Sequence, residues 1–340
     1  MLKAHLVKFL MHLYSMSKNI LITGAAGFIG SHLCKHFLKL GYKVRAVDNF
    51  STGKKNNIKS ILNNTNFEFF EGDIRDINLC MTICKNIDFI SHQAALGSVP
   101  RSIKDPITSN DVNVTGFLNI IKSASENDVK RFVFASSSSV YGDSIELPKI
   151  EENIGDPLSP YALTKSINEM YAQVFKSVFE LNYIGLRYFN VFGPNQDPKG
   201  PYAAVIPKFI EKFINYENPI INGDGTFSRD FTYIENVVLM NQLAIESIDS
   251  NTLNQVYNVA YGSRVSILEM TNEIKNLLSK YDTNINNIEI LHRKNRDGDV
   301  PHSLASIEKA NNLLNYYPIV DFESGLSKTV NWFWKNKINF

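Results

Sequence analysis

The sequence of 340 residues has little of several features that mark particular classes of protein. It contains only three cysteines, an odd number that gives no disulfide framework and suits a reducing cytoplasm. No run approaches the ~18–20 apolar residues that a membrane-spanning helix needs. Neither sign of charge dominates, because 35 Lys and Arg face 34 Asp and Glu. This balance, without a basic block, argues against a nucleic-acid partner.

The first 17 residues are predicted to form a helical extension on the outside of the fold, because their leucines recur near a helical period. The segment lacks the long apolar stretch and the small-residue cleavage site of a signal peptide. With two lysines it is a weak candidate for a membrane-surface helix.

From Lys18 onward, short apolar runs alternate with amphipathic stretches. The runs, predicted to be strands, are 19–23, 43–48, 66–70, 87–92, 131–136 and 183–188. The stretches, predicted to be helices, are 28–40, 56–62, 76–85, 107–126 and 161–181. This alternation predicts an α/β fold with a Rossmann-type, doubly wound parallel sheet, whose ligands bind at the carboxyl ends of the strands.

The character of the sequence changes after Asn190, where prolines separate shorter elements. We therefore expect a first domain over residues 18–188 and a smaller C-terminal α/β domain over 189–340. Within the second half, residues 229–262 are expected to pack back on the first domain, with a strand at 255–260 that joins the main sheet.

A glycine-rich turn, Thr23-Gly24-Ala25-Ala26-Gly27-Phe28-Ile29-Gly30, follows the first predicted strand and opens a helix. Glycines here allow a tight turn and a close approach of the backbone to a pyrophosphate, which the helix N-terminus attracts. Asp48 ends the second strand, where a carboxylate binds ribose hydroxyls and repels a 2′-phosphate. NAD is therefore favoured over NADP, although Lys54 and Lys55 lie nearby. Asp73, after the third strand, is placed to reach the adenine amino group.

Tyr161 and Lys165 lie four residues apart, and so on one face of a predicted helix. A phenol is a poor base at neutral pH because its pKa is near 10, but a neighbouring ammonium favours the phenolate. Serines 136–139 follow the fifth strand, where a hydroxyl can hydrogen-bond the substrate oxygen that loses its proton.

Together these motifs resemble those of the extended short-chain dehydrogenase/reductase family, and within it the bacterial UDP-N-acetylhexosamine 4-epimerases. The most specific stretches are 92–102, 186–193, 196–207 and 222–231. The resemblance implies C4 epimerisation of UDP-GlcNAc and UDP-GalNAc through a transient 4-keto sugar, with weaker action on UDP-Glc and UDP-Gal. It also implies a tightly bound, recycled NAD and a place in surface polysaccharide synthesis.

The resemblance assigns catalytic roles to Ser137, Tyr161 and Lys165. Tyr161 would take the proton of the 4-hydroxyl, and Lys165 would orient the ribose and tune Tyr161. The residues implied to hold NAD are Gly24, Gly27, Phe28, Ile29, Gly30, Asp48, Asn49, Asp73, Ile74, Gln93, Ala94, Ala95, Tyr161, Lys165 and Tyr188.

For the substrate, the resemblance implies that Arg229 and Arg296 bind the diphosphate, with Asn190 as an amide donor and Asp299 on the uridine ribose. The wall around C2 of the sugar would consist of Gly97, Ser138, Asn190, Gln196, Ala204 and Ser303. Substrate contacts are completed by Ser98, Ser137, Ser139, Tyr161, Val205 and Asn222.

Specificity for an acetylated sugar is expected from small side chains. Ser303 stands where epimerases restricted to unacetylated sugars carry a tyrosine, so it would leave room for an acetamido group. Pro301 departs from relatives, which often have a basic residue at its place.

Alternatives remain open. A UDP-glucuronate 4-epimerase is the nearest, and it would need a cation for the sugar carboxylate; a UDP-galactose 4-epimerase is another. A 4,6-dehydratase would carry Asp-Glu where this chain has Ser138-Ser139. A non-catalytic NAD-sensing protein would typically lose the Tyr161/Lys165 pair.

No metal site is expected. His32 and His36 have the spacing of ligands on a helix, but no third ligand is near in the sequence, so a place on the helix surface is predicted. Cys80 and Cys84 are expected to be ordinary buried or half-buried thiols. The apolar faces of 107–126 and 161–181 exceed the needs of one core, and in relatives these helices pair as a four-helix bundle, which predicts a homodimer.

Overall fold

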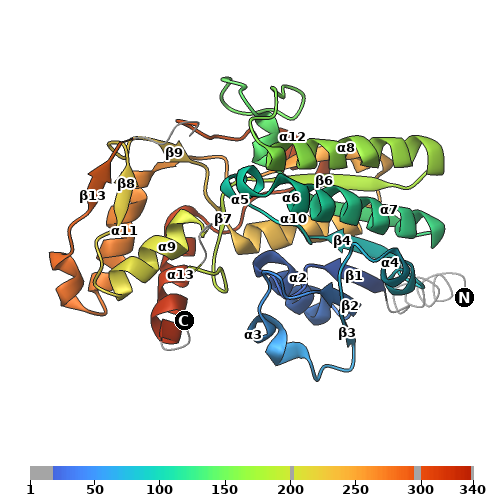
Figure 1. Cartoon of the computed structure of the whole chain (residues 1–340), viewed down its shortest axis with the longest axis horizontal. Coiled ribbons are helices and arrows are strands. Elements are labelled where there is room, and N and C mark those ends of the chain that lie inside the picture. The colour runs from blue at the N-terminus through green and yellow to red at the C-terminus, as the bar shows by residue number, and fades with distance from the viewer. Residues whose placement is uncertain (1–17, 200–202, 295–299, 338–340) are drawn as a thin grey trace, which may run out of the picture.

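The computed structural model describes residues 18–199, 203–294 and 300–337, and its centre is a seven-stranded sheet (Figure 1). The strand order is β11-β6-β5-β4-β1-β2-β3, and every neighbouring pair is parallel. The strands are β1 (Asn19–Thr23), β2 (Lys43–Asp48), β3 (Phe67–Glu71), β4 (Phe89–His92), β5 (Arg131–Ser137), β6 (Tyr183–Tyr188) and β11 (Gln255–Val259). The predicted doubly wound, Rossmann-type sheet is therefore confirmed, and a strand from the second half of the chain extends it.

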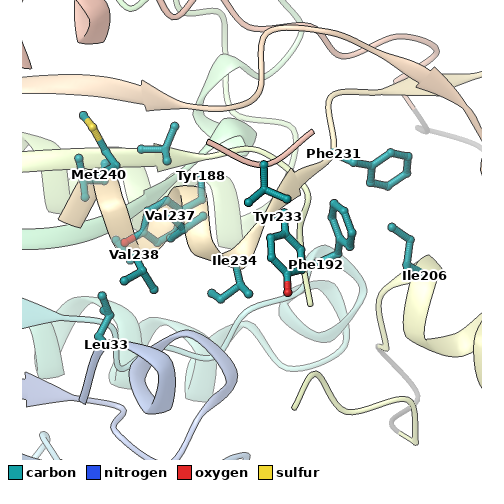
Figure 2. Packing of buried hydrophobic residues seen from close by; sticks show 14 of the residues in the cluster. Leu33, Tyr188, Phe192, Ile206, Phe231, Tyr233, Ile234, Val237, Val238 and Met240 are labelled. Atoms are coloured by element: carbon teal, nitrogen blue, oxygen red, sulfur yellow. The ribbon is translucent and has the colours of Figure 1, made fainter. Parts of the chain in front are cut away.

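Helices cover both faces of the sheet because residues along each strand alternate between two apolar clusters. On one face α2 (Phe28–Lys39) packs beside α10 (Ile234–Glu246), as Leu33 and Val238 show in Figure 2. On the other face lie α4 (Ile77–Ile83), α7 (Gly116–Glu126) and α8 (Pro160–Phe179). Burial on both faces explains the nearly continuous apolar runs of these strands.

Two predicted helices differ from the structure. Residues 107–126 form α6 (Pro106–Asn110), a π-helical turn (Asp111–Thr115) and α7 in succession. The stretch 56–62 is divided into α3 (Lys55–Ile58) and a 3₁₀ turn (Lys59–Ile61). A short helix that was not predicted, α5 (Val99–Lys104), follows β4, because Ser98 caps it and Pro100 suits a helical first turn.

The rest of the chain forms a lobe beside the carboxyl ends of the strands, on the left of Figure 1. Its helices are α9 (Val205–Ile214), α11 (Ile267–Ser279) and α13 (Phe322–Asn336), whereas α12 (Glu308–Leu314) contacts β11 of the main sheet and lies beside α8 in Figure 1. Three two-stranded sheets pair β7 (Val191–Phe192) with β10 (Thr232–Tyr233), β9 (Ser228–Arg229) with β12 (Val265–Ser266), and β8 (Ile220–Asn222) with β13 (Leu291–Arg293). Further 3₁₀ turns lie at Ser138–Tyr141, Ser250–Thr252 and Thr283–Asn287.

One apolar cluster runs from the sheet into this lobe. Figure 2 shows the transition, where Ile234 of α10 lies beside Tyr233 and Phe192, with Ile206 of α9 beyond them. Within the described residues no helix is both long and apolar enough to cross a membrane. The predicted N-terminal extension lies outside those residues, so it stays a prediction.

Candidate active site

The glycine-rich turn after β1 is built so that only glycine fits at its two ends. Gly24 has a φ of +66°, and a Cβ there would lie 2.8 Å from the backbone nitrogen of Ala94. A Cβ on Gly30 would lie 2.1 Å from the carbonyl oxygen of Gly24. The helix α2 starts directly after Gly27 without a side-chain cap. Its first N–H groups and positive dipole end therefore suit a phosphate.

A cavity of about 300 Å³ opens in front of this turn, along the carboxyl ends of β1 to β4. Twelve of the residues predicted for NAD line it, namely Gly24, Gly27, Phe28, Ile29, Gly30, Asp48, Asn49, Asp73, Ile74, Gln93, Ala94 and Ala95. Residues that the sequence did not single out also line it, among them Ser51, Thr52 and Val112. A cavity at the carboxyl ends of parallel strands, with a phosphate cradle and an acidic residue in its wall, fits a dinucleotide.

Asp48 closes the turn and lines the cavity as well. Its carboxylate accepts hydrogen bonds from the backbone N–H of Ala26 at 2.9 Å and of Phe50 at 2.7 Å. Both nearby lysines have carboxylate partners, since Lys54 pairs with Asp197 at 2.9 Å and Lys55 with Glu71 at 3.4 Å.

Asp73 is held in place by a cation. Arg75 donates to both of its carboxylate oxygens and, as the main cause, lowers the pKa of Asp73 to about 2. Asn49 adds a hydrogen bond of 2.8 Å. Asp73 is therefore ionised at neutral pH and fixed at the end of the cavity where adenine is predicted.

Tyr161, Lys165 and Ser137 converge, as the sequence predicted. Tyr161 and Lys165 lie one turn apart on α8, Ser137 ends β5, and the Ser137 side chain lies near enough to Tyr161 to act on the pKa of its phenol. Lys165 Nζ donates to the carbonyl oxygen of Ala135 at 2.7 Å and lies 6.0 Å from the centre of the Tyr161 ring.

Burial acts on both ionisable groups of this trio. It raises the pKa of Tyr161, which the nearby Ser137 side chain partly offsets. It lowers the pKa of Lys165 to about 8, against the attraction of the Glu169 carboxylate. Lys165 therefore remains mostly charged at neutral pH, and its charge is what can favour a phenolate on Tyr161.

Asn113 supports the site, and no sequence pattern pointed to it because it lies inside a stretch predicted as regular helix. The π-helical turn aims its side chain at the loop after β4, where Oδ1 accepts from the Leu96 N–H at 2.7 Å. Its Nδ2 reaches the Leu96 carbonyl oxygen and Thr164 Oγ1, both at 3.2 Å. Asn113 thereby fixes the cavity wall to α8.

Tyr188, which was predicted to bind NAD, is buried under the site rather than in the wall of the described cavity. Its hydroxyl donates to Gln93 Oε1 at 3.1 Å and accepts from Asn241 Nδ2 at 2.9 Å. Its role seen here is to hold Gln93, which does line the cavity.

Two further cavities adjoin on the lobe side and share Asn190 and Arg229 in their walls. One, of about 430 Å³, also takes in Val205 and Asn222, and the other, of about 500 Å³, takes in Ser138, Ser139 and Ser303. Seven of the predicted substrate residues thus line these two cavities, which we call the lobe-side space. Arg296 and Asp299 lie outside the described residues.

Other predicted substrate residues sit around this space without lining those two cavities. Gly97 lines the dinucleotide cavity instead, and Ser98 caps α5 with a φ of 120°. Gln196 donates to the Val191 carbonyl oxygen at 3.1 Å, and Ala204 precedes α9.

The loop that carries Ser303 is fastened to β9. The Pro301 carbonyl oxygen accepts from the Ser228 N–H and from Arg229, both at 3.1 Å. His302 Nδ1 shares a 2.9 Å hydrogen bond with Ser228 Oγ. Proline at position 301 thus leaves Ser303 in the cavity wall, because its carbonyl makes these bonds.

His32 and His36 are half-buried rather than on the helix surface, which corrects the prediction. His32 Nε2 lies 2.9 Å from the Pro194 carbonyl oxygen, and His36 Nε2 lies 2.7 Å from Gln242 Oε1. The two histidines therefore join α2 to the lobe loop and to α10. All three cysteines are buried free thiols, as predicted for Cys80 and Cys84.

The comparisons with known proteins agree with this arrangement. Residues 20–260 match the model of the NAD dependent epimerase/dehydratase family. The chain belongs to this family. Among its relatives, a UDP-glucose 4-epimerase of Mycolicibacterium smegmatis is 33% identical over 319 residues, covering 93% of this chain and 98% of the relative. The chain's membership of this family and the fit of the cavity to a dinucleotide together assign NAD as the cofactor.

Two solved structures of family members are similar in fold. The UDP-N-acetylglucosamine 4-epimerase of Methanobrevibacter ruminantium M1, in complex with UDP-N-acetylmuramic acid, has a TM-score of 0.86 and 39% identity, covering 94% of this chain and 99% of that one. The UDP-glucuronic acid 4-epimerase of Bacillus cereus, with UDP-glucuronic acid and NAD, has a TM-score of 0.85 and 31% identity, covering 93% and 99%.

Proposed function

We propose that this family member is a UDP-sugar 4-epimerase that prefers N-acetylated hexosamines, interconverting UDP-GlcNAc and UDP-GalNAc. The observation that carries the proposal is the convergence of Tyr161, Lys165 and Ser137 between a dinucleotide cavity and the lobe-side space. Ser138 and Ala162, the chain neighbours of Ser137 and Tyr161, line that space. A substrate there would meet the trio and NAD together.

The chain's own residues would handle the proton and the geometry. Tyr161 takes the proton of the 4-hydroxyl, Ser137 hydrogen-bonds the same oxygen, and the Lys165 ammonium stabilises the phenolate. NAD supplies the hydride acceptor and donor, so no net redox change occurs. Ser137 and Lys165 are buried and Tyr161 is half-buried, which limits the access of water and strengthens these electrostatic interactions.

The lobe side would hold the nucleotide. Arg229 and Asn190 lie where the two lobe-side cavities join, which suits a diphosphate between a nucleoside and a sugar. Val205 and Asn222 then line the nucleoside end. We further propose that residues 189–340 act as the substrate-binding part and 18–188 as the NAD-binding part.

The preference for an acetylated sugar rests on the small side chains at the other end. Ser138, Ser139 and Ser303 line a cavity of about 500 Å³. A tyrosine at position 303 would project into it, whereas a serine leaves volume for the acetamido group.

A second candidate, the epimerisation of a UDP-sugar that bears a carboxylate, is favoured by Lys149. This residue lines the same cavity and is 6% exposed, and its ammonium donates to the Ser144 carbonyl oxygen. In the described part of the chain no ion pair joins Lys149 to a carboxylate. Glu146 favours the charged form of Lys149, but burial outweighs it and lowers the pKa of the ammonium, which therefore suits an anionic substituent.

A direct test incubates the purified protein, without added NAD, with UDP-GlcNAc, UDP-Glc and UDP-glucuronate in separate reactions, and resolves the epimers. We expect the fastest conversion with UDP-GlcNAc. Faster conversion of UDP-glucuronate, lost in Lys149→Met, would favour the second candidate. Absence of conversion with all three would contradict the proposed reaction.

We also propose a homodimer formed through α7 and α8. Leu163, Met170, Val174 and Val178 recur along one side of α8 and are each at least half exposed. Such a stripe on a surface helix suits a second copy, which would complete a four-helix bundle.

The dimer is tested with Met170→Lys, which would place two charges in the apolar interface. We expect a shift toward monomer in sedimentation. Ile248→Lys, at a fully exposed apolar residue away from α8, is the matched control and should leave the mass unchanged. A monomeric wild-type protein would rule the dimer out.

A further inference from the structure

Three residues spaced four apart on α8 contact three consecutive residues at the end of β5. Tyr161 lies near Ser137, Lys165 donates to the carbonyl oxygen of Ala135, and Glu169 accepts from Ser136. The third contact is the one that the reaction does not use. Ser136 Oγ donates to Glu169 Oε1 at 2.5 Å, and both residues are buried.

Glu169 is fixed from the other side by an arginine of β6. Arg187 Nη2 donates to Glu169 Oε2 at 2.8 Å and Arg187 Nε donates to Oε1 at 3.0 Å, so the guanidinium binds the carboxylate with two parallel bonds. Arg187 in turn lies 4.9 Å from the centre of the Tyr141 ring and donates to the Glu151 carbonyl oxygen. The carboxylate therefore cannot shift without disturbing β6 and the 3₁₀ turn after β5.

We propose that Glu169 is a positioning residue of the reaction, which holds α8 in register with the end of β5 and so keeps Tyr161 against Ser137. This inference rests on the proposed function. A buried ion pair is weak ground for a gain in stability, because desolvation cancels much of the attraction. The pair is better explained by the geometry that it fixes, since a displacement of reacting groups by about 1 Å can cost about 100-fold in rate.

The charge of Glu169 has a second effect, on Lys165. Among the residues that the structure describes, Tyr161 on α8 and His92 on β4 also face Lys165, and burial keeps His92 neutral by lowering its pKa to about 3. Around Glu169 itself stand Arg187 and Tyr183 of β6, with Tyr141 on the far side of Arg187. Glu169 is thus the carboxylate that favours the charged form of Lys165, against burial.

The test compares four variants by kcat per bound NAD over a range of pH. In Glu169→Gln, kcat should fall by about 10- to 100-fold and the decline at alkaline pH should begin at lower pH, because Lys165 loses its proton more easily. Glu169→Asp keeps the charge but shortens the reach to Ser136, and Ser136→Ala removes the hydroxyl. In both variants kcat should fall, but the alkaline decline should begin at the same pH as in the wild type.

The fourth variant and a control separate positioning from folding. Glu169→Gln leaves Arg187 buried without its partner, so Glu169→Gln/Arg187→Gln removes both charges and keeps the inference testable if the single variant does not fold. Glu180→Gln, at the exposed end of the same helix, should change neither kcat nor the pH profile. An unshifted profile with near wild-type kcat per bound NAD in the Glu169 variants would overturn the inference. Absence of epimerisation by the wild-type protein would instead overturn the proposed function.

Discussion

The dinucleotide cavity and the lobe-side cavities are built in different ways. The walls of the first come from loops that directly follow β1, β2, β3 and β4, and much of its surface is backbone or small side chains. The walls of the second come from segments far apart in the chain, from α5 and the turn after β5 to the loop at 300–303. A wall of backbone fixes what is bound, whereas a wall of side chains can be altered one residue at a time.

The largest effect is expected where the two regions meet. Tyr161→Phe removes the hydroxyl that would act as the base and keeps the ring. We expect kcat to fall by about 1,000-fold or more with NAD still bound, because general-base catalysis contributes about 10²–10⁴-fold. Epimer formation and NAD released on denaturation are the measurements. Tyr317→Phe, at an exposed tyrosine, serves as the control, and retained turnover in Tyr161→Phe would remove this residue as the base.

The next effect tests the backbone wall. Gly30→Ala forces a Cβ against the Gly24 carbonyl oxygen, so the turn must open. We expect the variant to be purified with little NAD and to lose about 1–3 kcal/mol of unfolding free energy. Gly97→Ala lies in the same cavity, but its Cβ meets no atom within 4 Å, so it should keep the stability of the wild type. Equal NAD contents in Gly30→Ala and the wild type would contradict this account of the turn.

The side-chain wall is tested by Ser303→Tyr. The added ring should fill part of the cavity that Ser138 and Ser139 also line. We expect the ratio of kcat/KM for UDP-GlcNAc over UDP-Glc to fall by about tenfold or more, with NAD content unchanged. Ser303→Ala is the matched control. An unchanged ratio in Ser303→Tyr would mean that the acetamido group lies elsewhere.

The last prediction contrasts the two regions by how a buried ionisable group in each makes the unfolding free energy depend on pH. Burial lowers the pKa of His92, at the end of β4, to about 3, below its unfolded value of about 6.5. The unfolded state therefore binds the extra proton between these values, and His92 makes stability fall by up to about 1.4 kcal/mol per pH unit as pH drops below 6.5.

Asp230, in the lobe, has the opposite effect on the pH dependence of stability. Burial raises its pKa to about 7, so its contribution is lost as pH rises from its unfolded value. Because the contributions of His92 and Asp230 oppose each other over this range, denaturant unfolding at pH 4.5, 5.5 and 6.5 should show a stability that falls more steeply with rising pH in His92→Asn than in the wild type. Identical slopes would show that His92 is not buried neutral.

The same difference between the regions decides what could be predicted from the sequence. The dinucleotide residues belong to motifs that follow predicted strands, so the parallel sheet was enough to place Gly24, Asp48 and Asp73 together. Tyr161 and Lys165 were predictable because four residues is one helical turn.

The rest depends on tertiary contacts that leave no local pattern. The π-helical turn that aims Asn113 at Leu96 interrupts a stretch that reads as ordinary helix. Glu169 and Arg187 meet only after α8 packs across β5 and β6. In the lobe, an isolated bridge between Ser228 and His302 brings the Ser303 loop to the site across more than seventy residues.

The central claim is that Tyr161 and NAD together epimerise C4 of a UDP-hexosamine, and one measurement tests it most directly. The purified protein, without added NAD, is incubated in ordinary water with UDP-GlcNAc that carries deuterium at C4, and the UDP-GalNAc formed is analysed by mass spectrometry. The account predicts that the product keeps the deuterium, because the hydrogen leaves and returns as a hydride without exchange with water. Loss of the deuterium to water, or no UDP-GalNAc at all, would contradict it.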